Sequence, residues 1–286
     1  AGVYITLDEF KGRRPIRRAT LEMAVTPADF NAAESGRYLV GHTGGSRASG
    51  TATPIDVFDL MYEIPPRFLF MKAYNFLDKP FALRRPAPPG VAGLRAALRN
   101  IKIGQRATRW FSPTRPSFSS ASGKSDFITA GTVLGSAVMG KHIPWPQYVP
   151  MDRAEIVARW LAEQKAKGNL LQLDTMTSGA AFIAQAAKRS GLDISGHLVR
   201  VGGEPLTEAK AALFEEMGLQ YASQYAIAET GTVGLSCACA TTPDDVHILT
   251  YRLAIIQQPK ELPGWPEPIG AIFLTLFSPR MTKVML

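Results

Sequence analysis

The clearest pattern of apolar and polar positions lies between residues 150 and 230. Apolar side chains recur at helical spacing over residues 152–167, and Gly168 follows. Asp152 and Glu155 are spaced like a capping box, which predicts that the helix begins there. Its buried stripe is expected to consist of Ile156, Val157, Trp160 and Leu161.

Short apolar runs alternate with two further helical segments after this helix. The runs predict strands at residues 170–173, 197–201 and 219–222. Helices are expected over residues 180–189 and over residues that follow the N-cap Thr207 as far as Met217. Strands and helices that alternate at this spacing predict a parallel sheet with right-handed crossovers.

The two ends of the chain show different patterns. In the N-terminal part we expect a short strand at residues 38–40, a helix over 54–76 that Pro65 and Pro66 break or restart, and a helix over 91–103. In the C-terminal part, residues 246–257 and 271–277 predict strands joined by a proline-rich turn.

The fold class is therefore α/β, with a parallel-sheet core, helices on both faces and β-rich C-terminal structure. We expect one large domain over residues 1–286. Its parts would be residues 1–125 with a basic segment, the parallel α/β part 126–230, and the β-rich segment 231–286.

Composition excludes several classes of protein. The 286 residues are 46% apolar, mean hydropathy is near zero, and no apolar run approaches the length of a membrane span. The N-terminus shows no basic-then-apolar signal pattern. Cys237 and Cys239, the two cysteines, are one residue apart and exclude a disulfide framework. A reducing cytoplasm is the expected location.

The net charge of +8 is concentrated between residues 79 and 125, which hold ten Lys or Arg and no Asp or Glu. Such a segment could face nucleic acid or an anionic cofactor such as a nucleotide or coenzyme A, or form a solvated cationic face. No zinc-finger spacing or aromatic-basic RNA signature accompanies it, so nucleic acid is an unlikely partner.

A glycine-rich loop follows the first predicted strand. Its backbone is freed by Gly44, Gly45 and Gly50, and Arg47 adds a permanent cation. Hydroxyl donors come from Thr43, Ser46, Ser49 and Thr51. This composition suits a phosphate-binding loop, although no Walker A spacing is present, and it equally suits a flexible linker.

Two more motifs follow predicted strands of the parallel part. In the first, Val201-Gly-Gly-Glu-Pro-Leu206, the glycines would let a flat ring lie on the backbone. In the second, which runs from Tyr225 to Gly231, Tyr225 offers a stacking face and Glu229 a hard oxygen ligand suited to Mg²⁺. Each could also be a turn with a surface acid.

Taken together, these three motifs resemble the adenylate-forming acyl-CoA synthetase superfamily, and most closely its phenylacetate–CoA ligase branch. The resemblance covers residue 38 to the end and implies that the glycine loop holds the phosphates of ATP. It further implies that the nucleotide is bound by Gly202, Gly203, Glu204, Pro205, Tyr225, Ala226, Glu229 and Thr230. Of these, Tyr225 would stack on the adenine ring and Glu229 would hold Mg²⁺. Catalytic roles fall on Thr43, Ser46, Arg47 and Glu229.

The sequence also departs from the family pattern. Arg47 interrupts the glycine loop, whose usual Pro-Lys is missing. Ala226 replaces a glycine, and Ala228 replaces a threonine whose hydroxyl meets the α-phosphate, a role that Thr230 could take only if the turn allows it. The ribose-binding Gly-Asp segment and the small C-terminal domain with the catalytic lysine are expected to be absent. The chain would then be a fragment, or unable to complete the reaction alone.

The implied function is ATP-dependent activation of a carboxylic acid to an acyl-adenylate, followed by thioester formation with coenzyme A or a carrier-protein thiol. The acyl pocket is expected around residues 127–145 and 176–180, with His142 near the carboxylate or purely structural. A homodimer is compatible with the sequence. The alternatives are a non-catalytic nucleotide- or acyl-binding protein of the same fold and, ranked last, a basic nucleic-acid-binding module.

A zinc site is a further, weak hypothesis. Cys237 and Cys239 with His247 supply three ligand types, and Asp244 or Asp245 could add a fourth. This spacing is unspecific, and we expect zinc to be absent and both cysteines to pack as small apolar side chains.

Overall fold

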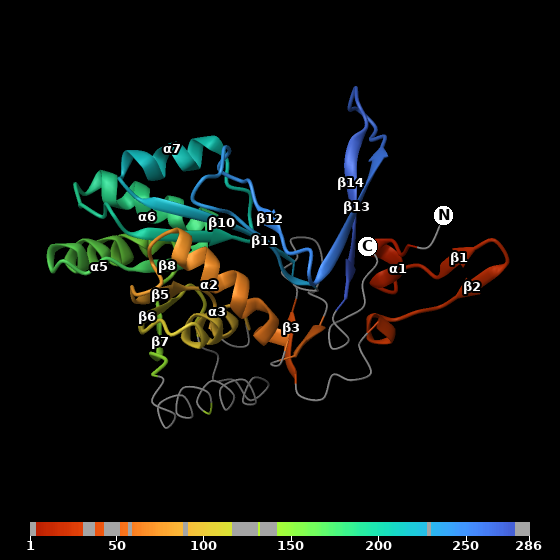
Figure 1. Cartoon of the computed structure of the whole chain (residues 1–286), viewed down its shortest axis with the longest axis horizontal. Helices are drawn as coiled ribbons and strands as arrows, with labels where there is room; N and C mark the ends of the chain where they lie inside the picture. The colour runs from red at the N-terminus through yellow and green to blue at the C-terminus, as the bar shows by residue number, and fades with distance from the viewer. Residues whose placement is uncertain are drawn as a thin grey trace. The chain divides into compact units, whose positions relative to one another are not determined.

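The structure is a computed structural model that describes residues 4–30, 38–42, 52–56, 59–87, 91–115, 131, 142–227 and 230–277. It divides into two compact units (Figure 1). The first contains Ala1–Tyr62, Ile227–Val233 and Leu249–Leu286, and the second contains Glu63–Ala226 and Gly234–Ile248. The glycine-rich loop, residues 43–51, lies outside the described residues.

The second unit is built around most of an eight-stranded sheet with the order β12-β11-β10-β9-β8-β5-β6-β7. Its six consecutive strands β5 to β10 run parallel, whereas β12 is antiparallel to β11. The strands are β5 (Phe81–Arg84), β6 (Ala107–Ser112), β7 (Pro146–Tyr148), β8 (Gln172–Met176), β9 (Leu198–Gly202), β10 (Gln220–Ile227), β11 (Gly231–Leu235) and β12 (His247–Ile248). The predicted parallel α/β core is confirmed.

The strand order reverses between β5 and β8. From β5 the chain proceeds to β6 and β7 on one side, then returns to β8 beside β5 and proceeds to β9 and β10 on the other. In open α/β sheets, ligands bind outside the carboxyl ends of the strands at such a switch point. The ends of β5, β8, β9 and β10 are therefore where a site is expected.

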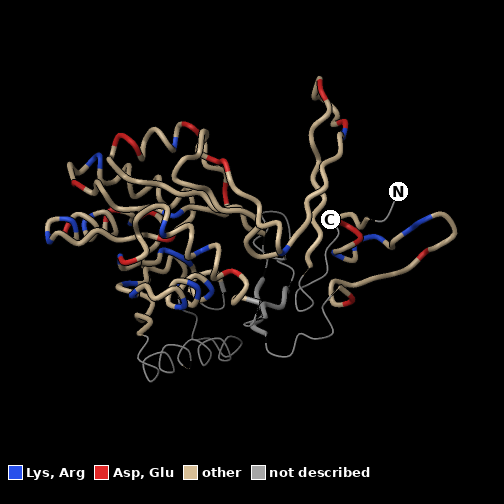
Figure 2. The backbone as a smooth tube through the Cα atoms, viewed as in Figure 1, with Lys and Arg blue, Asp and Glu red and all other residues tan. Residues whose placement is uncertain are grey.

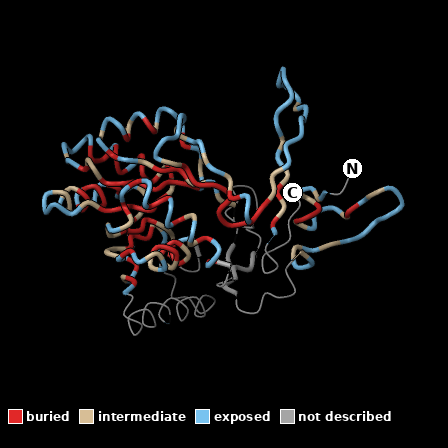
Figure 3. Tube along the Cα trace, viewed as in Figure 1, coloured by how far each residue is buried: buried red, intermediate tan, exposed pale blue. Residues whose placement is uncertain are grey.

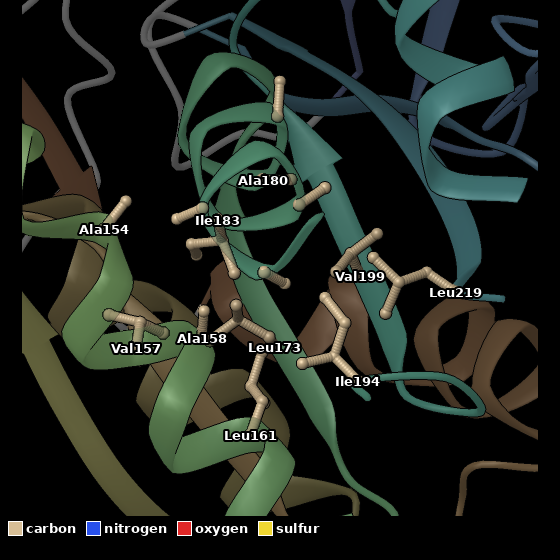
Figure 4. Close-up of a cluster of buried hydrophobic side chains, with 14 of the residues drawn as sticks. Ala154, Val157, Ala158, Leu161, Leu173, Ala180, Ile183, Ile194, Val199 and Leu219 are labelled. Carbon is tan, nitrogen blue, oxygen red and sulfur yellow. The ribbon is translucent and has the colours of Figure 1, made fainter. Parts of the chain in front are cut away.

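Helices cover both faces of this sheet. On one face, α5 (Ala154–Ala166), α6 (Thr177–Arg189) and α7 (Glu208–Glu216) enclose an apolar core (Figure 4). It includes Val157, Leu161, Leu173, Ile183, Val199 and Phe214. On the other face, α2 (Ile64–Ala73) packs Phe70 and Met71 against the sheet, and α3 (Val91–Lys102) lies beside it.

Several predicted helix boundaries agree with the structure. The residues that follow α5, α6 and α7 include Gly168, Gly191 and Gly218, all with positive φ, as glycine at a helix C-terminus allows. The predicted capping box is wrong, because a 3₁₀ turn, η3 (Met151–Arg153), precedes α5 and no side chain caps the helix. Ile156 is also exposed rather than buried.

Two other expectations need correction. The predicted helix over 54–76 begins only at Ile64, and Pro65 and Pro66 occupy the first turn of α2, where a missing N–H removes no hydrogen bond; of the two roles expected for them, they start a helix and do not break one. The residues before them form β4 (Ala52–Asp56) and η2 (Asp59–Glu63) instead of helix. The predicted strand at 219–222 extends to Ile227 as β10, so Tyr225 lies within the strand and not after it.

Among its described residues, the first unit contains short helical segments and three antiparallel hairpins. The helical segments are α1 (Leu7–Phe10), the 3₁₀ helix η1 (Pro27–Phe30) and most of η2. The hairpins pair β1 (Ile16–Arg18) with β2 (Leu21–Met23), β3 (Tyr38–His42) with β4, and β13 (Leu253–Lys260) with β14 (Ile269–Leu276). The β-rich C-terminal structure is thus confirmed, and the outer half of β13–β14 is exposed (Figure 3). Across the described residues, no helix has both the length and the apolar character that crossing a membrane requires.

Candidate functional site

The turn after β9 is shaped by two glycines. Gly203 has a φ of +86°, a conformation that side chains disfavour. A Cβ on Gly202 would lie 2.7 Å from the carbonyl oxygen of Gln224, so β10 approaches too closely for any side chain. The backbone of the turn is consequently bare on the side where the two strands end.

Glu204 fixes this turn to the start of α6. Its carboxylate accepts hydrogen bonds from the backbone N–H and the hydroxyl of Ser178, at 2.7 and 3.0 Å. The hydroxyl of Thr177 donates to the carbonyl oxygen of Glu204 at 2.9 Å. A carboxylate at a helix N-terminus is favoured by the helix dipole. The visible role of Glu204 is therefore to hold the turn in place.

The turn and the end of β10 enclose a cavity of about 390 Å³. Gly203, Glu204 and Pro205 line one side, and Tyr225 and Ala226 line another. Tyr225 is 39% exposed, which leaves its ring available to a ligand. The structure thus brings together the two motifs of the parallel part, which are separate in the sequence.

Five residues of the cavity wall were not predicted as nucleotide-site residues: Leu206, Ser223, Gln224, Asp244 and Val246. Asp244 and Val246, which precede β12, also line the cavity. In the sequence they stand in a polar loop, where only the spacing to Cys237 and Cys239 points to Asp244. Gly202 and Thr230 are not among the lining residues.

Most of the remaining predicted site residues lie outside the part of the chain that the structure describes. Thr43, Gly44, Gly45, Ser46, Arg47, Ser49, Gly50, Thr51, Ala228 and Glu229 lie outside the described residues. Thr230 is buried and belongs to the first unit, where its carbonyl oxygen accepts a hydrogen bond from Arg252 Nη2 at 3.2 Å.

A buried ionic cluster lies beside the cavity and is formed by residues of β8, β9 and α2 and by the residue that follows β5. Its centre is Asp174, which is fully buried. Arg85 Nε lies 2.9 Å from Asp174 Oδ1, Arg67 Nη2 lies 3.6 Å from Oδ2, and Arg200 pairs with the same carboxylate. Arg200 also donates to Gln224, which lines the cavity.

Figure 2 colours the described Lys and Arg residues blue. Of the alternatives for the basic segment, a solvated cationic face is wrong for four of its arginines, which are buried or have side chains at most 15% exposed. Arg84 is buried and donates to the carbonyl oxygens of Gly179 and Met151 at 3.1 and 3.3 Å. Arg95 and Arg99 each lie 2.5 Å from the buried carboxylate of Glu63. Arg85 pairs with Asp174. These side chains hold the interior together instead of facing water.

Burial changes the acidity of these cations. It lowers the pKa of Arg85 to about 10, so that this guanidinium still carries its charge at neutral pH. Burial also lowers the pKa of Arg67 and of Arg200, and the neighbouring arginines add to the effect. The positive charges of the cluster therefore repel one another.

The residues of the zinc hypothesis are dispersed over exposed or half-exposed positions. Cys237 is half-buried, whereas Cys239 and His247 are exposed, so packing of both cysteines in apolar surroundings is wrong for Cys239. Across the described ranges, no three His, Cys, Asp or Glu residues are grouped as metal ligands.

The expected acyl pocket is described only in part. Thr177, Gly179 and Ala180 are buried at the start of α6, and the Met176 methyl group lies near Gly203. His142 is exposed. Most of residues 127–145 lie outside the described residues.

No protein-family model matches the chain, and no curated protein matches it either. Solved structures do match. One is 2-hydroxyisobutyryl-CoA ligase in complex with 2-HIB-AMP and CoA, with a TM-score of 0.51, 15% identity, and 86% of this chain and 46% of that chain covered. The same ligase in the postadenylation state has a TM-score of 0.50 at 14% identity, with 98% of this chain and 54% of that chain covered.

A second similar structure is VinN in complex with L-aspartate. Its TM-score is 0.52 at 13% identity, and the match covers 92% of this chain and 53% of that chain. The chain spans about half the length of each of these structures. At this level of identity the likeness concerns the fold: the chain has the α/β fold of the large N-terminal domain of AMP-binding ligases.

Proposed function

We propose that the protein activates a carboxylic acid with ATP to an acyl-adenylate and passes the acyl group to coenzyme A. It would act as a member of the adenylate-forming superfamily, similar to the phenylacetate–CoA ligase branch, in the cytoplasm. One observation carries the proposal: the Gly202–Pro205 turn and Tyr225 meet at one cavity, at the carboxyl ends of parallel strands, in a fold shared with such ligases.

The described residues suit an adenine ring. The bare backbone at Gly203 allows a flat ring to approach, and the exposed ring of Tyr225 can stack on it. Glu204 would keep the turn in position through Ser178. ATP supplies the adenylyl group that makes the acid reactive, and these residues would bind and orient it.

The phosphates would be held by the glycine-rich loop, with Thr43, Ser46 and Arg47 as donors. Glu229 would hold Mg²⁺, because a carboxylate is a hard oxygen ligand. Catalysis of this kind consists mainly of positioning and charge neutralisation. Arg47→Ala should therefore weaken ATP more than AMP, since the additional phosphates of ATP face the loop.

The experiment that tests the proposal is acid-dependent exchange of pyrophosphate into ATP. A panel of 2-hydroxyisobutyrate, L-aspartate, phenylacetate and a fatty acid should show exchange with one class of acid above the no-acid background. Glu229→Gln should reduce this exchange and its Mg²⁺ dependence, but leave adenosine binding nearly unchanged. The matched control is Glu216→Gln, which removes an exposed carboxylate at the end of α7.

A non-catalytic nucleotide- or acyl-binding protein is the second candidate. It is favoured by Ala228, which stands where the family has a hydroxyl for the α-phosphate. Adenosine and AMP binding without exchange for any acid would support this candidate. No binding of adenosine, AMP or ATP would contradict both.

A further inference from the structure

The ionic cluster beside the cavity holds more positive than negative charge. Arg67, Arg85 and Arg200 share the one carboxylate of Asp174. Two more carboxylates act on these arginines: Glu63, which Arg95 and Arg99 already bind, and Glu204, which is bonded to Ser178. Buried charges are costly unless they are paired, and among the described residues these five arginines share three carboxylates. An additional anion at this place would therefore be favoured.

The three arginines differ in what their guanidinium groups contact. Arg67 and Arg200 are almost fully buried, and each makes a second contact, to Asn100 and to Gln224 respectively. Arg85 is 15% exposed and uses its Nε on Asp174. Within the part of the chain that the structure describes, its two terminal nitrogens make no hydrogen bond.

Arg85 is also next to the cavity. Its Nη1 lies 4.0 Å from the point where a Cβ on Gly203 would stand, and Gly203 lines the cavity. The bond from Nε to Asp174 fixes the plane of the guanidinium. Two free N–H groups in a fixed fork match the two oxygens of a carboxylate or a phosphate.

We infer that Arg85 binds an oxyanion of the ligand that occupies this cavity, and that Asp174 positions it for this role. The oxyanion has two sources, the acid and the phosphate of the nucleotide, which share this chemistry. The inference rests on the proposed function in so far as it takes the ligand from that reaction. It makes Arg85 a specificity-determining residue.

The test measures binding of charged and neutral probe pairs to the full chain by calorimetry. AMP and adenosine form one pair, and 2-hydroxyisobutyrate and its amide form the other. Arg85→Gln should weaken the anionic member of one pair by about 10-fold or more, the scale of a charged hydrogen bond, and leave its neutral member unchanged. The pair that responds identifies the phosphate or the carboxylate as the source.

Two further variants keep the test decisive. Arg85→Lys retains the charge but not the fork, and should lose less affinity than Arg85→Gln. Arg189→Gln removes an exposed arginine at the C-terminal end of α6, and should not change the affinity for either pair of probes. Circular dichroism establishes that each variant is folded, and Arg85→Lys carries the test if Arg85→Gln is not.

The outcomes separate the inference from the proposed function. Loss of affinity for the acid alone, with adenosine not bound by any variant, would contradict the nucleotide part of the function and support Arg85. Adenosine and AMP bound equally, with no effect of Arg85 on either pair, would overturn the inference and leave the function standing. Wild-type protein that binds none of the four probes overturns the inference as well.

Discussion

The two faces of the central sheet are filled with different chemistry. On the face covered by α5, α6 and α7 the core is apolar, with Val199 and Val201 supplied by β9. The face of α2 and α3 also has an apolar cluster around Phe70 and Met71, but there Arg200 of the same strand pairs with Asp174 of β8. Because successive side chains of a strand alternate between faces, one short segment serves both.

The two faces would therefore have different roles: the apolar face stabilises the sheet, and the ionic face supplies groups that can bind a ligand. Van der Waals contacts on the apolar face have no directional preference, and its buried Arg84 is already bonded to the carbonyl oxygens of Gly179 and Met151. The close packing of this face holds the strands rigidly. The ionic face places guanidinium groups directly after β5 and within β9, and that of Arg85 lies near Gly203, which lines the cavity. A site built on rigid strands keeps its geometry.

The largest effect is expected from breaking the ionic face. Asp174→Asn would leave Arg67, Arg85 and Arg200 without their shared carboxylate, and should lower the free energy of unfolding by about 3–5 kcal/mol. Urea denaturation measures this. Asp193→Asn removes an exposed partner of Lys165 and should cost less than about 1 kcal/mol. Equal losses in the two variants would show that the buried cluster does not stabilise the fold.

Breaking the apolar face should cost somewhat less. Leu161 is fully buried in α5, and Leu161→Ala leaves a cavity that should lower the free energy of unfolding by about 3 kcal/mol. The control is Leu69→Ala in α2, where the side chain is 65% exposed and the change should be within about 0.5 kcal/mol. A loss at Leu69 as large as that at Leu161 would mean that this surface is covered in solution.

The two faces also differ in how far the sequence predicts them. Helical spacing identifies Val157, Trp160 and Leu161, because apolar side chains that repeat at this period are typical of a helix face that packs on a core. The glycines after the helices predict their ends for a similar reason. Ile156 is apolar and fits the predicted stripe, but it lies at the edge of the helix face and is exposed.

The ionic face does not show itself in the pattern of apolar residues. The predicted strand at 170–173 stops just before Asp174, although β8 continues through it to Met176. The predicted strand at 219–222 stops before Ser223 and Gln224, which are held by Ser236 and Arg200. A polar residue in a strand is buried only where a partner from a distant segment meets it, and the sequence does not reveal such partners.

The sequence identifies the two motifs that line the candidate site, but not the residues that reach it from other segments. Gly203 and Tyr225 follow from local residue types and from the resemblance to a family, and the structure places both on one cavity. Asp244 and Arg85 reach the same region from segments without any motif. Their proximity depends on how the strands are ordered.

A smaller effect is expected where the ionic face meets the cavity. Gly203→Ala must adopt a positive φ and should lower the free energy of unfolding by about 1–2 kcal/mol. Gly168→Ala after α5 has the same kind of strain, with φ at +75° and open space around it. Both variants should lose similar stability, but only Gly203→Ala should weaken AMP binding, which calorimetry measures. Equal binding by the two variants would remove Gly203 from the site.

The smallest effect concerns His197, a buried polar group on the side of α5 and α6. Its Nδ1 accepts a hydrogen bond from the Leu171 N–H at 3.2 Å, so the proton is on Nε2, which donates to the Leu161 carbonyl oxygen at 3.0 Å. Burial lowers the pKa of His197, and its backbone hydrogen bonds offset this only in part. The folded state therefore favours the neutral ring, unlike the charged groups on the other face.

This predicts the direction of a pH effect. Because the folded pKa lies below the unfolded value, the stability that His197 contributes is present above about pH 6.5 and is lost as pH falls below it. A single group changes stability by at most about 1.4 kcal/mol per pH unit. Urea denaturation between pH 7.5 and about 5.5 should show a decline in wild-type protein that His197→Asn reduces. The carboxyls of Glu9 and Asp193, whose pKa values are lowered to about 2 by hydrogen bonds from Arg18 and Lys165, respond only in more acidic solution.

The control is His247→Asn, which changes an exposed ring and should keep the full decline in stability. If His197→Asn declines as steeply as wild-type protein, the pH response of this fold arises elsewhere and the neutral ring is not what the apolar face requires.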